Sequence, residues 1–186
     1  MLDSVLGGQA ENPDLWAFLE SLRRGETLRG TVAAIERFGV FVALDRGPAH
    51  PIFPGVGFIT LPELSWRRYE AATDIIKLGQ HVVCEFLQFD TTNLEARLSL
   101  RATQPDPFQA FADQTAPGRE LTGRVTKIVP FGLFVQVADG VEGLVHIQAP
   151  ASPRGAADGV VQVGDELAVV VTDLDRTRRR LALGLR

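Results

Sequence analysis

Apolar residues recur at every second position in a series of short segments, which is the pattern of β-strands. In the C-terminal part of the chain, such segments cover residues 121–127, 133–137, 141–146, 166–173 and 180–185. The turn Asp139-Gly140 predicts a tight hairpin between the second and the third segment. Five short strands within 69 residues favour a small closed barrel, because closure removes the exposed edges of an open sheet.

The N-terminal part of the chain repeats this pattern. Residues 25–42 match residues 118–135 without a gap, at an offset of 93. The offset then falls to 86 at Gly57 and to 85 at the ends of the two copies, so the first copy carries seven extra residues before Gly57. We therefore expect two barrels, within residues 23–103 and 118–186.

The seven extra residues fall in a turn-rich stretch that predicts a long surface loop over residues 45–56. A tolerated insertion is the preferred interpretation, because long surface insertions cost little. An interaction site is the alternative, since the loop contains His50 and several prolines.

Three short helices are expected beside the strands. In the N-terminal segment, residues 1–22, an apolar stripe predicts a helix that caps the first barrel; the stripe comprises Leu15, Phe18, Leu19 and Leu22. Residues 104–117 predict a helical linker whose Phe108 and Phe111 pack onto one of the barrels. A third short helix is expected around residues 66–78 of the first unit. The predicted fold is all-β, with two tandem five-stranded barrels, an N-terminal helix and a helical linker.

Composition and charge restrict the possible functions. The chain has 186 residues, of which 45% are hydrophobic and 23% charged, and this excludes collagen-like, coiled-coil and wholly disordered proteins. The formal net charge of −4 argues at first against an anion-binding protein. However, residues 1–22 carry −4 and residues 104–117 carry −2, whereas each repeat carries +1. The acidic excess thus lies outside the repeats, so the net charge of the whole chain does not exclude an anionic partner.

The expected setting is the cytoplasm. Cys84 is the one cysteine and cannot form an internal disulfide, which fits a reducing compartment. No run approaches the roughly 18 apolar residues of a membrane span, and the acidic start of the chain does not have the pattern of a signal peptide. We therefore expect no membrane partner.

The repeated motif resembles a known family. Both copies contain Gly-x-x-Leu-x-Gly-x-Val-x-x-Ile-x-x-Phe-Gly-x-Phe-Val, and the second continues with Gly-Val-Glu-Gly-Leu-Val-His-Ile, Val-Gly-Asp-Glu-Leu and Arg-Leu-x-Leu. These residues resemble the S1 (S-one) repeat, which belongs to the OB-fold class and takes its name from the largest small-subunit ribosomal protein. The resemblance covers about residues 25–101 and 118–186. It implies a non-catalytic protein that binds single-stranded RNA in translation or RNA metabolism, with the ribosome or a ribosomal protein as a possible further partner.

The resemblance also implies which residues contact RNA. In the second copy these are Phe131, Phe134, His146, Asp175 and either Arg178 or Arg179. In the first copy they are Phe38, Phe41 and Asp90, with Arg97 as the only arginine nearby. Thr60 stands where the histidine is expected, and Glu95 or a neighbour replaces the arginine. The second copy is therefore expected to bind RNA more strongly than the first.

These residue types suit single-stranded RNA, which offers unstacked bases and a charged backbone. Leu133 and Val135 alternate with Phe134, so Phe134 should face outward as a stacking surface. A single Phe-Gly-x-Phe motif more often belongs to a core, and its repetition in register favours stacking. Lys127 and Arg124 could extend the same positive groove. For the basic run at residues 176–180, a solvated turn is the default interpretation. Its place between the fourth and fifth strands, where OB folds bind ligands, favours contact with RNA.

Other classes of site have weaker support. The acidic residues at 165–175 lack the spacing of a calcium loop, and the dispersed histidines and Cys84 do not form a zinc motif. Cys84 is interpreted as a buried inert thiol. No phosphate loop or nucleophile motif is present, so no enzyme and no cofactor are expected. The leading alternative is a docking module that binds the ribosome or a ribonuclease partner, and the weaker first repeat favours it for that half.

Overall fold

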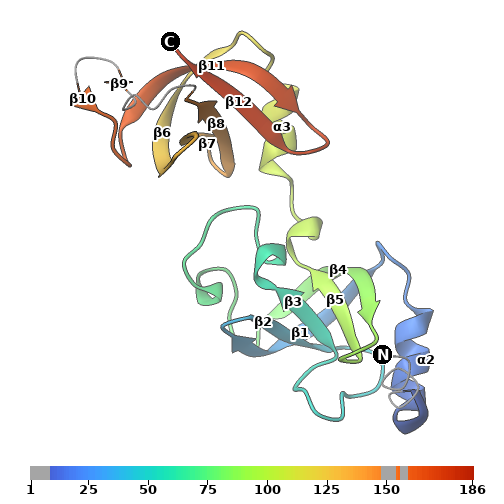
Figure 1. Ribbon diagram of the computed structural model, residues 1–186. Helices are drawn as coiled ribbons and strands as arrows, with labels where there is room; N and C mark the ends of the chain where they lie inside the picture. The colour runs from blue at the N-terminus through green and yellow to red at the C-terminus, as the bar shows by residue number, and fades with distance from the viewer. Residues whose placement is uncertain (1–8, 148–153, 156–158) are drawn as a thin grey trace. The chain divides into compact units, whose positions relative to one another are not determined.

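The computed structural model describes residues 9–147, 154–155 and 159–186. The chain divides into two compact units, residues 1–105 and 106–186. Each unit contains a closed five-stranded barrel (Figure 1). The predicted all-β architecture with two tandem barrels is confirmed.

The first barrel has the strand order β1-β2-β3-β5-β4. Its strands are β1 (Thr27–Glu36), β2 (Gly39–Leu44), β3 (Gly57–Thr60), β4 (His81–Asp90) and β5 (Glu95–Ser99). Neighbouring strands are antiparallel except β3 and β5, which pair in parallel and close the barrel. Three short 3-10 turns accompany them: η1 (Leu61–Glu63), η2 (Ala72–Asp74) and η3 (Arg101–Thr103).

The helix expected over residues 66–78 is absent, and only the turn η2 forms within this segment. Two of its aromatic side chains are held by residues outside the segment. The Arg101 guanidinium lies 4.4 Å from the centre of the Trp66 ring, and the Tyr69 hydroxyl donates a hydrogen bond to the carbonyl of Leu61. Asp74 accepts hydrogen bonds from the amides of Glu70 and Ala71. These contacts stabilise an irregular path and outweigh the local helix propensity.

The second barrel has the strand order β11-β12-β8-β7-β6. Its strands are β6 (Glu120–Val129), β7 (Gly132–Ala138), β8 (Val141–His146), β11 (Glu166–Asp175) and β12 (Arg180–Leu185). A small antiparallel ladder, β9 (Arg154–Gly155) with β10 (Gly159–Val160), was not expected from the sequence. Gly140 has a φ of 71° in the predicted hairpin, a conformation that favours glycine.

The two barrels repeat the same backbone irregularities. The ladder register shifts between Val32 and Ala34 in β1, and between Val125 and Lys127 in β6. The next shift lies after Phe86 in β4 and after Val171 in β11. Such bulges bend strands and increase their twist, which lets short strands close into a barrel.

Each barrel has its own helix. The helix α2 (Pro13–Ser21) lies beside the first barrel and α3 (Pro107–Asp113) beside the second (Figure 1). The helix α2 buries Leu15 and Leu19 in the first core, as predicted, and α3 buries Phe108 and Ala112 in the second core. The offset of 93 that relates the barrels also relates Leu15 to Phe108 and Leu19 to Ala112. The segment expected as a linker therefore contains the counterpart of α2, a helix that caps the second barrel.

Cys84 lies in the first core, and burial raises the pKa of its thiol to about 12. The thiol is therefore protonated and unreactive at neutral pH, as predicted. In the described part of the chain, no helix is long and apolar enough to span a membrane.

Candidate nucleic-acid interface

The second barrel brings three of the predicted site residues to one outer face. Leu133 and Val135 of β7 point into the core and are fully buried, whereas Phe134 between them faces outward and is half-buried. Phe131 precedes β7 and is 53% exposed. Gly132 pairs in register with His146 at the end of β8, and the Phe131 and His146 rings lie 6.4 Å apart. Strand alternation thus turns Phe134 outward, and the Phe131 and His146 rings lie near one another where β7 begins and β8 ends.

A hollow of about 520 Å³ lies on this face. Its lining includes Phe134, Leu144 and His146 from β7 and β8, Asp173 from β11, and Arg180 from the start of β12. Its volume lies within the range of ligand sites in proteins. The apolar wall suits a base, while Arg180 and His146 can donate hydrogen bonds to acceptors on a nucleotide.

The prediction that Arg178 or Arg179 faces RNA did not include Arg180. At the offset of 85, Arg180 is the counterpart of Glu95, so the repeat itself carried the signal. Arg178 is exposed beside Asp175, whose carboxylate accepts a hydrogen bond from the Arg178 amide. Asp175 therefore shapes the β11–β12 turn.

Arg179, which also lines this hollow, and Arg176 are both bound to the helix α3. Arg179 forms an ion pair with Asp106 at the start of α3, and its guanidinium lies 5.2 Å from the centre of the Phe108 ring. Burial alone would raise the pKa of Asp106, but hydrogen bonds from Arg179 and two backbone amides lower it below its usual value. Arg176 donates to the Asp113 carboxylate at 2.6 Å and to the Ala112 carbonyl at 2.5 Å.

Two further basic residues lie on β6. Lys127 is exposed and pairs in register with Phe134, so it borders the aromatic face. Arg124 forms an exposed ion pair with Glu166, with 3.7 Å between nitrogen and oxygen. Exposed pairs of this kind contribute little to stability, so phosphate could displace Glu166.

The first barrel presents a different surface. Phe38 is 57% exposed, like its counterpart Phe131, but Phe41 is only 6% exposed. Phe58 of β3 stacks on Phe38, with ring centres 6.0 Å apart, and contacts Phe41 edge-on, with ring centres 5.0 Å apart. Thr60 borders a hollow of about 580 Å³ at the place that His146 has in the second barrel. The first copy thus keeps its aromatic residues but exposes less of them.

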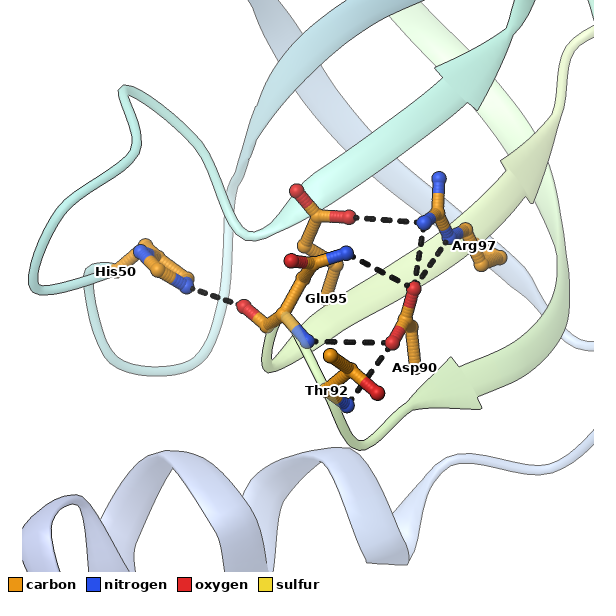
Figure 2. Close-up of polar contacts among 6 residues, drawn as sticks. His50, Asp90, Thr92, Glu95 and Arg97 are labelled. Carbon is orange, nitrogen blue, oxygen red and sulfur yellow. Dashed lines mark hydrogen bonds and ion pairs between the residues drawn. The ribbon is translucent and has the colours of Figure 1, made fainter. Parts of the chain in front are cut away.

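Arg97 of the first barrel is surrounded by acidic groups (Figure 2). Its Nε and Nη2 lie 3.1 and 2.5 Å from the Asp90 carboxylate, and Nη2 lies 3.5 Å from Glu95. Its guanidinium also lies 4.7 Å from the centre of the Phe58 ring. Burial alone would raise the pKa of Asp90, but hydrogen bonds from Arg97 and the turn amides lower it. The Asp90 carboxylate therefore neutralises the one predicted cation of this face.

Comparison with known families matches the S1 RNA binding domain at residues 21–101 and 114–186, which include both barrels. The chain belongs to the S1 RNA-binding domain family. The helices α2 and α3 lie before the first and second matched segments, apart from the last residue of α2.

Relatives of this S1 protein include small ribosomal subunit proteins bS1. The protein from Mycolicibacterium smegmatis is 41% identical over 171 residues, covering 91% of this chain and 34% of the relative. That of Neisseria meningitidis is 30% identical over 189 residues, covering 100% of this chain and 31% of the relative. The chain thus spans about a third of the length of these relatives. Among solved structures, the intact alpha subunit of aIF2 from Pyrococcus abyssi is 27% identical, with a TM-score of 0.39, covering 50% of this chain and 34% of the other.

Glu95 of the first S1 domain is an acid that the fold buries. Its side chain is 4% exposed, and burial raises its pKa from 4.5 to about 7 despite the nearby Arg97. The raised pKa means that the folded chain keeps this proton to a higher pH than the unfolded chain. The contribution of Glu95 to stability is therefore fully present below pH 4.5 and is lost as the pH rises through about 7.

Replacing Glu95 with glutamine should remove this pH dependence. Glutamine keeps the size and polarity of the side chain but carries no charge, so E95Q should gain roughly 1–3 kcal/mol in the free energy of unfolding at pH 8 and little at pH 4.5. Urea titration followed by tryptophan fluorescence checks this, because Trp16 and Trp66 are the only tryptophans and both lie in the first unit. Parallel pH profiles for E95Q and the wild type would contradict the assignment.

In residues 9–147, 154–155 and 159–186, no three His, Cys, Asp or Glu side chains are grouped to hold a metal ion.

Proposed function

We propose that this S1 protein binds single-stranded RNA on the outer face of its second barrel. The observation that carries the proposal is the convergence of Phe131, Phe134 and His146 beside a hollow that Arg180 also lines. In this proposal, the two phenylalanine rings stack on successive bases, a mode that tolerates any base. Arg180 and Lys127 contact phosphates, and His146 donates to a base or a sugar.

The RNA is proposed to be an RNA of translation, such as a messenger RNA near the ribosome. The bS1 relatives are ribosomal proteins, and this chain corresponds to about a third of their length. A cytoplasmic setting and a non-catalytic role go with the proposal. The lone buried thiol of Cys84 suits a reducing compartment.

Docking to a ribosomal or ribonuclease protein is the second candidate, and the first barrel favours it. There Phe41 is buried and Arg97 is neutralised by Asp90, which disfavours a phosphate backbone. Phe38 still offers an exposed apolar ring. If docking were the main role, the purified chain would not bind RNA. In a pull-down from lysate, it would retain a ribosomal protein or a ribonuclease in stoichiometric amount.

Titration of a fluorescently labelled single-stranded oligonucleotide with the chain at several salt concentrations tests the proposal. Two or three phosphate contacts should give a shallow slope of log affinity against log salt, about −0.7 for each contact. Arg180→Ala should lower the affinity about fivefold and make the slope less negative by about 0.7. Arg29→Ala, which removes an exposed arginine of strand β1 in the first barrel, is the matched control. An affinity that neither salt nor Arg180→Ala changes would contradict this face.

A further inference from the structure

The loop that connects β2 and β3, residues 45–56, covers part of the first barrel's aromatic face. Phe53 of this loop stacks on Phe41, with ring centres 5.3 Å apart and planes inclined by 27°. Phe134, the counterpart of Phe41, is half-buried, and the corresponding connection in its barrel is the short hairpin Asp139-Gly140. The insertion therefore supplies Phe53 as a further cover of Phe41, beside the contacts that Phe58 and Phe38 make with it.

His50 holds this loop in place. Its Nδ1 accepts hydrogen bonds from the amides of Ile52 and Phe53, at 3.1 and 2.8 Å. The proton must then lie on Nε2, which donates to the Asn93 carbonyl in the β4–β5 turn at 2.8 Å (Figure 2). The imidazole also stacks on Phe53, with ring centres 4.7 Å apart. One side chain thus links the loop to the β4–β5 turn and supports the Phe53 ring.

Two glycines let the loop backbone lie close against the barrel and its helix. Gly47 has a φ of 94°, and a Cβ atom there would lie 2.6 Å from the Phe18 ring of α2. A Cβ atom on Gly55 would lie 2.4 Å from the backbone of Val42 in β2. Both ends of the loop therefore pack closely against the first unit, and its position is defined by contacts along its length.

We infer that loop 45–56 is an intramolecular lid, in which Phe53 takes the place of a nucleobase on Phe41. This inference rests on the proposed function, because it assumes that these aromatic faces stack bases. An RNA that approaches the first barrel must displace Phe53 and break the His50 hydrogen bonds before a base can stack on Phe41. With the lid closed, Phe41 is covered, whereas its counterpart Phe134 in the second barrel stays half-exposed.

The test uses the full chain with Phe131→Ala and Phe134→Ala, which removes the stacking rings of the second barrel. Adding Phe53→Ala to this chain should raise the affinity for labelled oligouridylate about tenfold, since it exposes one stacking ring. Adding Ile52→Ala instead is the matched control, because Ile52 is the neighbouring residue and is 82% exposed. It should leave the affinity unchanged.

A second variant tests the lid in case Phe53→Ala unfolds the first unit. His50→Ala detaches the lid from Asn93 while Phe41 and Phe53 remain, and it should also raise the affinity of the doubly substituted chain. Tryptophan fluorescence reports whether the first unit stays folded, since both tryptophans lie there. If neither folded variant gains affinity, the lid is overturned. Failure of the proposed function looks different, since the wild-type chain itself would then not bind the oligonucleotide.

Discussion

Replacing Phe131 and Phe134 together with alanine is expected to weaken single-stranded RNA binding at least about 30-fold, because each base stack contributes roughly 1–3 kcal/mol. The fold should tolerate the change, since Phe131 is mostly exposed and Phe134 points away from the core. Equilibrium titration of a labelled oligonucleotide measures the loss, and the unfolding midpoint checks that the barrel is intact.

Phe38→Ala is the matched control for this experiment. Phe38 is the counterpart of Phe131 in the first barrel and is exposed to a similar extent. Its loss should change the affinity less than about twofold, because Phe41 beside it is covered and Arg97 is neutralised. Equal losses for Phe38→Ala and the double variant would show that the binding face is not confined to the second barrel.

Phe108→Ala is expected to destabilise the second unit by about 3–5 kcal/mol, the usual cost of removing a buried phenylalanine ring. Phe108 lies in the second core and also packs against the Arg179 guanidinium. Its replacement therefore leaves a cavity and weakens the contact that holds α3 to the β11–β12 turn. A segment that merely connects two barrels would show a much smaller effect.

Two spectroscopic signals separate the units in this measurement. Tryptophan fluorescence follows the first unit, because Trp16 and Trp66 both lie there, whereas circular dichroism follows both. Phe108→Ala should lower the unfolding midpoint of the second unit, which only circular dichroism reports. The midpoint of the first unit, which fluorescence reports, should stay the same. Phe111→Ala is the control, since Phe111 is only partly buried and should cost less. An unchanged second transition would contradict the role of α3 as a cap.

The strands were predictable because their signal is local. Alternating apolar residues and the Asp139-Gly140 turn set the strand limits, and β8 and β12 begin and end at the expected residues. The segment at 66–78 was predicted wrongly because Trp66 and Tyr69 are held by Arg101 and Leu61, contacts that a local pattern does not encode.

The aromatic face was predictable from alternation and repetition, but the partners of the charged side chains were not. Arg179 pairs with Asp106, which is 73 residues earlier in the chain, and only the folded helix α3 brings them together. Phe53 likewise reaches Phe41 through a loop that the repeat offset identifies as an insertion without indicating its path. Arg180 could have been found by aligning the ends of the two copies.

The contacts of α3 also change how the net charge is divided between the two units. The sequence placed the acidic excess outside the repeats, yet Asp106 and Asp113 of that excess pair with Arg179 and Arg176. Counted with its helix, the second unit has nine basic and ten acidic residues, a net charge of −1. Its affinity for RNA should therefore depend mainly on stacking, with a small contribution from Arg180, Arg178 and Lys127.

An NMR titration of the full chain with a short single-stranded oligouridylate tests the central claim most directly. The predicted result is that amide signals around Phe131, Phe134, His146 and Arg180 shift in proportion to bound RNA, while signals of the first barrel stay in place. Shifts confined to the first barrel, or no shifts at RNA concentrations in the high micromolar range, would contradict it.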